Sequence, residues 1–187
     1  AGTAAAGPST APAPTKAAAT LSSSQKSAFV ARVNSLRASL GASSMQTIAW
    51  DDNLAAFATE VASRCQLAHS NASERMSVPG WSGTYVGENL AAGTPGLLAQ
   101  ATDATKVSAD LDAALNMWWG ERSNYDYATD TCASGQVCGH FTQVAWAQTS
   151  SIGCAVVMCS SYASFGSAYS VVCEFGPGGN YVGQRPY

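Results

Sequence analysis

The chain has 187 residues, of which 47% are hydrophobic and only 11% are charged, and its formal net charge is −3. This length and apolar content suffice to bury one substantial core, which predicts a single main domain. The sequence contains no basic run, and this together with the negative charge excludes nucleic acid and an anionic membrane surface as its main partner.

The first 20 residues are Ala, Pro, Thr, Ser and Gly apart from one Lys. Such a segment cannot offset the entropy of ordering by burying apolar surface. We therefore expect a flexible tail over residues 1–20 and one folded domain over residues 21–187. No apolar stretch approaches the length of a membrane span, so an integral membrane protein is not expected.

Three segments of the first two thirds have the apolar spacing of amphipathic helices. The first covers 22–41, with serine caps at its start and a glycine stop at its end. An extended TIAW at 47–50 leads through an aspartate cap into the second helix, within 51–70. The third helix is expected over 106–125, where Val, Leu and Trp recur on one face.

The last third of the chain changes its period. The stretches 141–148, 151–159 and 167–175 are short, rich in β-branched or aromatic residues, and separated by Ser and Gly. They predict antiparallel strands. Helices followed by strands indicate an α+β domain in which helices cover a sheet.

The chain has six cysteines and no C-x-x-C pair, which favours three disulfides over a zinc finger and predicts a secreted protein. The opening AGTAAAGPSTAPAP has no features of a signal peptide, so we interpret the chain as a mature form. A glycosylation sequon at Asn71 agrees with secretion. Cys154 and Cys173 are expected to face each other on successive strands.

The two histidines, His69 and His140, each lie close to a cysteine. Cys65 and His69 are one helical turn apart, and Cys138 precedes His140 by two residues. A Cys65–Cys138 bond would hold both histidines near each other, and Cys132–Cys159 is then the remaining pair. An exchange of partners between Cys138 and Cys159 stays open, because six cysteines allow several pairings. Structural or surface roles for the two histidines also stay open.

Two carboxylates are candidates to meet these histidines. Glu88 lies between Gly87 and Asn89, in what reads as a turn. Glu121 is expected at the carboxyl end of the third helix beside two tryptophans, where a negative charge is unfavourable by about 0.3–1 kcal/mol. An ion or a histidine would compensate it; the alternative is that Glu121 faces water.

The motifs GHFTQVAW, GENLA, CQLAHS, IGCAVVMC and PGGNYVGQRPY, in this order, resemble the CAP superfamily, and most closely its plant-type and fungal pathogenesis-related class 1 members. The resemblance runs from about residue 21 to residue 187. It implies an α-β-α sandwich with a central antiparallel sheet, and a cleft formed by His69, Glu88, Glu121 and His140. That cleft is expected to hold Zn²⁺ or Mg²⁺, which is not required for folding.

The resemblance also implies a secreted, monomeric protein that binds a sterol or fatty acid in a host–pathogen or defence context. A sterol needs buried apolar area, at about 25 cal/mol per Å². We therefore expect the lipid to bind near Leu97 and Leu98, in a loop rich in Gly, Pro and Thr, rather than at the four polar side chains. The alternative is that both leucines fill the core.

Two other functions remain as alternatives. Residues Pro177 to Tyr187 match the pattern of a signalling peptide released from some relatives, with a host or plant receptor as partner, although Glu174 and Phe175 depart from the usual cleavage site. The four cleft residues with a metal could also activate water for hydrolysis. Neither G-x-S-x-G nor H-E-x-x-H occurs, so an enzyme is not expected.

Overall fold

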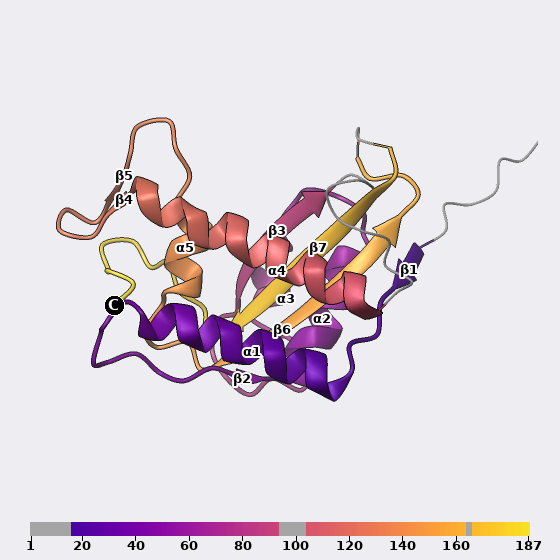
Figure 1. The fold of residues 1–187 in the computed structure, drawn as a ribbon, viewed down its shortest axis with the longest axis horizontal. Helices are drawn as coiled ribbons and strands as arrows, with labels where there is room; N and C mark the ends of the chain where they lie inside the picture. The colour runs from indigo at the N-terminus through magenta and orange to yellow at the C-terminus, as the bar shows by residue number, and fades with distance from the viewer. Residues whose placement is uncertain (1–15, 94–103, 164–165) are drawn as a thin grey trace, which may run out of the picture.

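The computed structural model describes residues 16–93, 104–163 and 166–187. Figure 1 shows a three-layer arrangement in which α1 and α4 cover one face of a sheet and α2 lies behind the other. The helices are α1 (Ser23–Ala38), α2 (Asp52–Ala62), α3 (Ala72–Arg75), α4 (Ala104–Gly120), the 3-10 turn η1 (Glu121–Asn124) and α5 (Gly139–Val144). The strands are β1 (Lys16–Ala18), β2 (Ala49–Trp50), β3 (Gly87–Gly93), β4 (Tyr125–Asp126), β5 (Thr131–Cys132), β6 (Ser151–Cys159) and β7 (Ala168–Gly176).

The main sheet has the strand order β1-β6-β7-β3, and each neighbouring pair in it is antiparallel. The short β2 runs parallel to the start of β6. The strand β3 lies at one end of this order and pairs with β7 along its whole length. These observations confirm the α+β class and the α-β-α sandwich.

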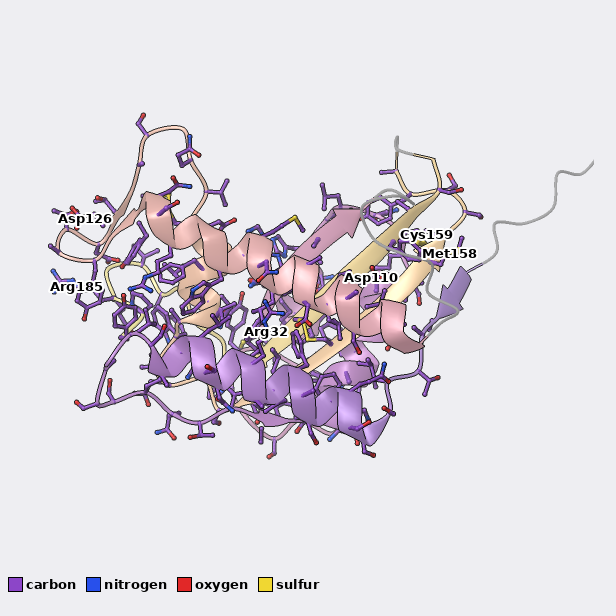
Figure 2. The ribbon with its side chains drawn as sticks, in the orientation of Figure 1. Arg32, Asp110, Asp126, Met158, Cys159 and Arg185 are labelled. Carbon is purple, nitrogen blue, oxygen red and sulfur yellow. A yellow bond between two sulfur atoms is a disulfide. The ribbon has the colours of Figure 1, made fainter. Side chains whose placement is uncertain are left out.

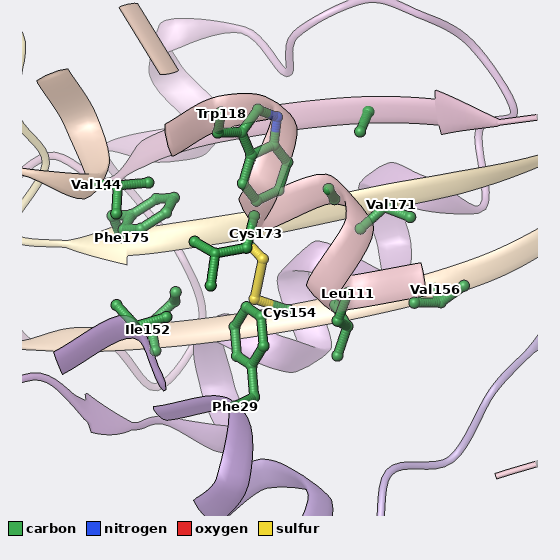
Figure 3. Packing of buried hydrophobic residues seen from close by; sticks show 14 of the residues in the cluster. Phe29, Leu111, Trp118, Val144, Ile152, Cys154, Val156, Val171, Cys173 and Phe175 are labelled. Atoms are coloured by element: carbon green, nitrogen blue, oxygen red, sulfur yellow. A yellow bond between two sulfur atoms is a disulfide. The ribbon is translucent and has the colours of Figure 1, made fainter. Parts of the chain in front are cut away.

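Alternate residues of β6 and β7 point into two separate cores, as the two-residue period of a strand requires. One core lies under α1 and α4 and contains Ile152, Cys154 and Val156 of β6. Figure 3 shows the Cys154–Cys173 disulfide at its centre, with Phe29 and Trp118 packed nearby. The other core lies under α2 and contains Ala155, Val157 and Cys159 of β6. Burial on both faces explains why β6 and β7 are so continuously apolar.

The predicted tail was too long. Lys16–Ala18 forms β1 and pairs with β6, and the backbone N–H of Ala19 donates to the carbonyl of Val156 at 3.0 Å. The ordered domain therefore begins before residue 21, and residues 1–15 lie outside the described residues.

The strand predicted over 141–148 is wrong, because this segment begins with the helix α5. A distant carboxylate explains the difference: Oε2 of Glu121 accepts from the backbone N–H of His140 at 3.0 Å and of Phe141 at 3.2 Å. These N–H groups belong to the first turn of α5 and would otherwise lack partners. Since the capping group lies 19 residues upstream, no short sequence window contains it.

The turn predicted at Glu88 is also wrong, because Glu88 lies within β3. Gly87 suggested a turn, but the structure requires a glycine there for a different reason. A Cβ atom at Gly87 would lie 1.9 Å from Oε1 of Gln143 in α5. The glycine therefore permits close packing between β3 and α5.

Two of the three predicted disulfides are wrong. The bond Cys154–Cys173 is confirmed, with directly paired strand residues as its ends. The other bonds are Cys65–Cys159 and Cys132–Cys138, each with a Cα–Cα distance of 5.8 Å. Because α2 ends at Ala62, Cys65 lies beyond the helix in a turn with φ of 55° and reaches the end of β6.

No helix in the described ranges is both long enough and apolar enough to span a membrane.

Candidate functional site

The four predicted cleft residues lie together around one cavity of about 450 Å³. His69, Glu121 and His140 line it, and Glu88 is hydrogen-bonded behind His69. The remaining lining is apolar and consists of Leu67, Ala68, Leu90, Ala91, Ala92, Met117 and Trp118.

The first pair in the cavity is His69 with Glu88. Nδ1 of His69 lies 2.6 Å from Oε1 of Glu88. The same carboxylate accepts from the backbone N–H of Ser70 at 3.0 Å and from its hydroxyl at 2.7 Å. Burial alone would raise the pKa of the Glu88 carboxyl, but the hydrogen bonds from His69 and Ser70 outweigh it, so the pKa lies below its ordinary value.

The second pair is His140 with Glu121. Nδ1 of His140 lies 2.6 Å from Oε1 of Glu121, while Oε2 caps the first turn of α5. The ring of His140 also stacks on Trp118, with centroids 6.2 Å apart. The expectation that a histidine compensates Glu121 is thus met in the structure.

The two pairs have the same chemical arrangement. In a neutral imidazole whose Nδ1–H donates to a carboxylate, Nε2 carries a free lone pair. Each glutamate therefore orients its ring and leaves Nε2 available to a ligand. In the described part of the chain, no three His, Cys, Asp or Glu side chains are placed to hold one metal ion. The ligands for a cation would accordingly be the two imidazoles, with the glutamates behind them.

The two pairs approach the cavity around the end strand β3. Leu90 belongs to the core under α2, whereas Ala91 belongs to the core under α4, and both line the cavity. One hydrogen bond joins the second pair to this strand, since Nδ2 of Asn89 donates to the carbonyl of His140 at 3.1 Å. Trp118, which stacks on His140, is also joined to β3, because its Nε1 donates to the carbonyl of Leu90 at 3.1 Å. The cleft therefore bridges two layers, and no Cys65–Cys138 bond is needed to bring the histidines together.

Sequence reasoning missed Glu174, which is fully buried on β7 directly opposite Glu88 on β3. Burial, reinforced by the negative charge of Glu88, raises the pKa of the Glu174 carboxyl well above its ordinary value. The available signal was a single acidic residue in the otherwise apolar run AYSVVCEF.

Leu97 and Leu98 fall outside the described residues, in the segment that directly follows Gly93 at the end of β3. Asn71 is exposed and caps α3, where its Oδ1 accepts from the N–H of Glu74 at 3.0 Å and from the hydroxyl of Ser73 at 2.6 Å.

The chain is similar to known proteins over most of its length. The chain matches the family described as "Cysteine-rich secretory protein family" (CAP) over residues 30–175. It is 37% identical to pathogenesis-related protein 1A of Nicotiana tabacum over 158 residues, which cover 82% of this chain and 76% of that protein.

Solved structures show the same fold. Schistosoma mansoni venom allergen-like protein 4 superposes with a TM-score of 0.65 at 22% identity, covering 88% of this chain and 94% of that one. A structure of NaASP2 with Zn²⁺ superposes with a TM-score of 0.64 at 24% identity, covering 89% of this chain and 86% of that one. By the extent of the family match and the identity to the plant protein, the chain belongs to the cysteine-rich secretory protein (CAP) family.

Proposed function

We propose that this is a secreted binding protein of a defence or host–pathogen context, whose cleft binds a divalent cation, best Zn²⁺, through Nε2 of His69 and His140. One observation carries the proposal: both rings are fixed at Nδ1 by carboxylates that backbone N–H groups hold in turn. Three disulfides and the pathogenesis-related plant relatives support the location and context.

The donor chemistry fits Zn²⁺ better than Mg²⁺. Imidazole nitrogen is a common zinc ligand, whereas Mg²⁺ requires oxygen ligands in octahedral geometry. Both glutamates already hold a histidine, so water would complete the coordination. The solved neighbour NaASP2 is named with Zn²⁺, which agrees with this choice.

Isothermal titration of Zn²⁺ into the protein tests the cation proposal. His69→Ala and His140→Ala should each abolish binding, and Glu88→Gln or Glu121→Gln should weaken it about 10–100-fold by loosening the rings. Affinity should fall on acidification, because a protonated imidazole cannot ligate. Glu60→Gln, on the exposed side of α2, is the matched control and should bind like the wild type. Unchanged affinity in both histidine variants would overturn the assignment.

A lipid is the second candidate ligand, and the apolar wall of the cavity favours it. Leu67 and Met117 line the cavity and are each about half exposed to solvent. This wall adds apolar area that the four polar side chains alone lack, so a sterol or fatty acid would bind against Leu67 and Met117. The role of Leu97 and Leu98 stays a prediction. A fatty acid between α1 and α4 is not favoured, because the space there is only about 80 Å³.

Sterol binding by purified variants tests the lipid proposal. The Leu67→Ser/Met117→Ser and Leu97→Ser/Leu98→Ser double variants should each bind a sterol more weakly than the wild type. Met76→Ser, an exposed methionine outside the cavity lining, should bind normally. Wild-type affinity in both double variants would reject this site.

The two remaining functions receive less support. Release of the peptide 177–187 requires a protease to reach the chain near residues 174–176, which are buried in β7. The peptide is also held in place, for example by the N–H of Gly178, which donates to the carbonyl of Tyr85 at 2.6 Å. For hydrolysis, the described residues lining the cavity include no Ser, Thr or Cys nucleophile, so the reaction would depend entirely on a metal-activated water.

Glycosylation at Asn71 is compatible with its role in α3. The cap uses Oδ1, whereas a glycan is attached through Nδ2. We propose that a glycan at this exposed position lies near His69 at the cavity rim. Mass spectrometry of the natural protein, with Asn71→Gln as control, tests the modification.

A further inference from the structure

A second cavity, of about 490 Å³, lies at the end of the molecule formed by the C-terminal segment and the β4–β5 hairpin. Figure 2 shows Asp126 of the hairpin and Arg185 of the C-terminal segment side by side at this end. The guanidinium of Arg185 donates to the carbonyl of Ala128 at 2.6 Å and thereby joins the two segments. The cavity is distinct from the His/Glu cleft and shares none of its lining residues.

Both walls of this cavity are held in place. On one side, the amide of Asn180 donates to the carbonyl of Gly139 at 2.8 Å and accepts from the hydroxyl of Thr142 at 2.7 Å. On the other side, the Cys132–Cys138 disulfide closes a short loop that contributes to the lining. A site with fixed walls loses little entropy when it orders a ligand.

The cavity presents polar side chains that a ligand could contact. Gln136 and Gln184 are exposed, line the cavity and form no side-chain hydrogen bond with the described residues. Their amides can donate and accept at once. Tyr181, which also lines the cavity, is 44% exposed and packs against Trp146, with ring centroids 5.9 Å apart.

Apolar surface completes the lining. Val137 is 58% exposed and Val182 is fully exposed, and both belong to this cavity. Among the described residues that line it there is no Lys, Arg or His, and the one carboxylate is Asp130, which accepts from the hydroxyl of Tyr125 at 2.6 Å. The lining therefore lacks the cations that would bind an anionic ligand and the second carboxylate that a metal site would need.

We propose that this cavity binds a neutral oligosaccharide. A sugar ring offers hydroxyl groups, which match amides that donate and accept, and an apolar C–H face, which packs on an exposed aromatic ring such as Tyr181. The size agrees, since ligand cavities commonly measure about 300–1,000 Å³. A charged oligosaccharide is disfavoured, because Asp130 would repel an acidic sugar.

An NMR titration of the labelled protein with neutral hexasaccharides tests the site. The probes are β-1,3-glucan, β-1,4-glucan and chitin hexamers, with an acidic galacturonan hexamer as comparison. At least one neutral hexamer should shift the resonances of Gln136, Tyr181, Gln184 and the Trp146 indole, whereas the acidic one should not. Tyr181→Ala should weaken binding about tenfold, and Gln136→Ala or Gln184→Ala about 2–10-fold.

Two variants separate a loss of binding from a loss of the fold. Gln136→Ala removes a side chain without hydrogen bonds to described residues, so its fold should be unchanged even if Tyr181→Ala disturbs the cavity. Met76→Ala, outside both cavities, should bind like the wild type. Absence of any shift with all neutral hexamers, as expected if the exposed rim binds a protein instead, would refute the proposal. Shifts confined to His69 and His140 would refute it too.

Discussion

Glu88 and Glu174 face each other across β3 and β7, and the structure moves their pKa values in opposite directions. Glu88 is favoured as the anion, because His69 and Ser70 donate hydrogen bonds to it. Glu174, which is fully buried, is favoured as the neutral acid. The two shifts favour a single negative charge on the pair, located on Glu88, whose Oε1 contacts His69.

This arrangement predicts that Glu174→Gln stabilises the protein at neutral pH. The unfolded chain loses the Glu174 proton near the ordinary glutamate pKa of about 4.3, whereas the folded protein retains it to higher pH. The wild type thus loses stability as the pH rises above that value. The Glu174→Gln variant does not, because its amide does not titrate. Urea denaturation should show a gain at pH 7 that disappears near pH 4.

The exposed Glu60→Gln is the control and should change stability little at either pH, since it removes only a surface ion pair with Arg64. An equal gain from Glu174→Gln at both pH values would point to packing and contradict the titration argument.

Arg37, like Glu174, is a buried ionisable residue that the sequence pattern does not reveal. Its guanidinium is buried and donates to the carbonyls of Gln46, Val144, Trp146, Ala147 and Thr149. Burial lowers the pKa of Arg37 to about 10, so the side chain remains charged at neutral pH. The apolar spacing of helix 22–41 correctly indicates Phe29 and Val33, but it contains no sign that an arginine joins them in the interior.

Among the elements, those with strong local periodicity were predictable. The helices α1, α2 and α4 and the strands β6 and β7 carry their own pattern, because each buries a continuous face. The elements α5 and β3 were not predictable from the local sequence. A carboxylate from η1 caps α5, and the glycine of β3 makes room for the side chain of Gln143. The four cleft residues were identified by resemblance, whereas the pairing of each histidine with its glutamate required the fold.

The contact between α2 and β6 gives a prediction at the level of elements. A Cβ atom at Gly153 of β6 would lie 2.1 Å from the backbone nitrogen of Ala55 and 2.6 Å from the carbonyl oxygen of Asp51. Backbone atoms cannot move aside as a side chain can, so Gly153→Ala should displace α2 and destabilise the protein by about 1–3 kcal/mol. Thermal or urea denaturation measures the change.

Gly120→Ala is the matched control. No atom lies within 4 Å of a Cβ built there, and the backbone of Gly120 is helical, with φ of −60°. This variant should be neutral or slightly stabilising. Similar losses in both variants would show that close packing at Gly153 is not the cause.

At the scale of the whole molecule, the three disulfides close loops of very different length. Cys132–Cys138 joins residues only 6 apart. Cys65–Cys159 joins residues 94 apart. The pairing Cys154–Cys173 followed from neighbouring strands, but Cys65–Cys159 depended on where α2 ends, which spacing alone does not give.

Loop length predicts the effect of removing each bond. In the chain-entropy model, Cys65→Ala/Cys159→Ala should lose about 4–5 kcal/mol of unfolding free energy, and Cys132→Ala/Cys138→Ala about 2 kcal/mol. Urea denaturation of the two double variants measures the difference. A larger loss from the short loop would mean that strain or packing, rather than loop closure, dominates.

Each cleft histidine follows a disulfide-bonded cysteine within a few residues: His69 follows Cys65, and His140 follows Cys138. The two bonds are separate, and each fixes the backbone next to one imidazole. A chain made under reducing conditions contains the same four cleft side chains, but no disulfide restrains the backbone beside either imidazole. We therefore expect the geometry of the cleft, as well as the fold, to depend on oxidation of the cysteines.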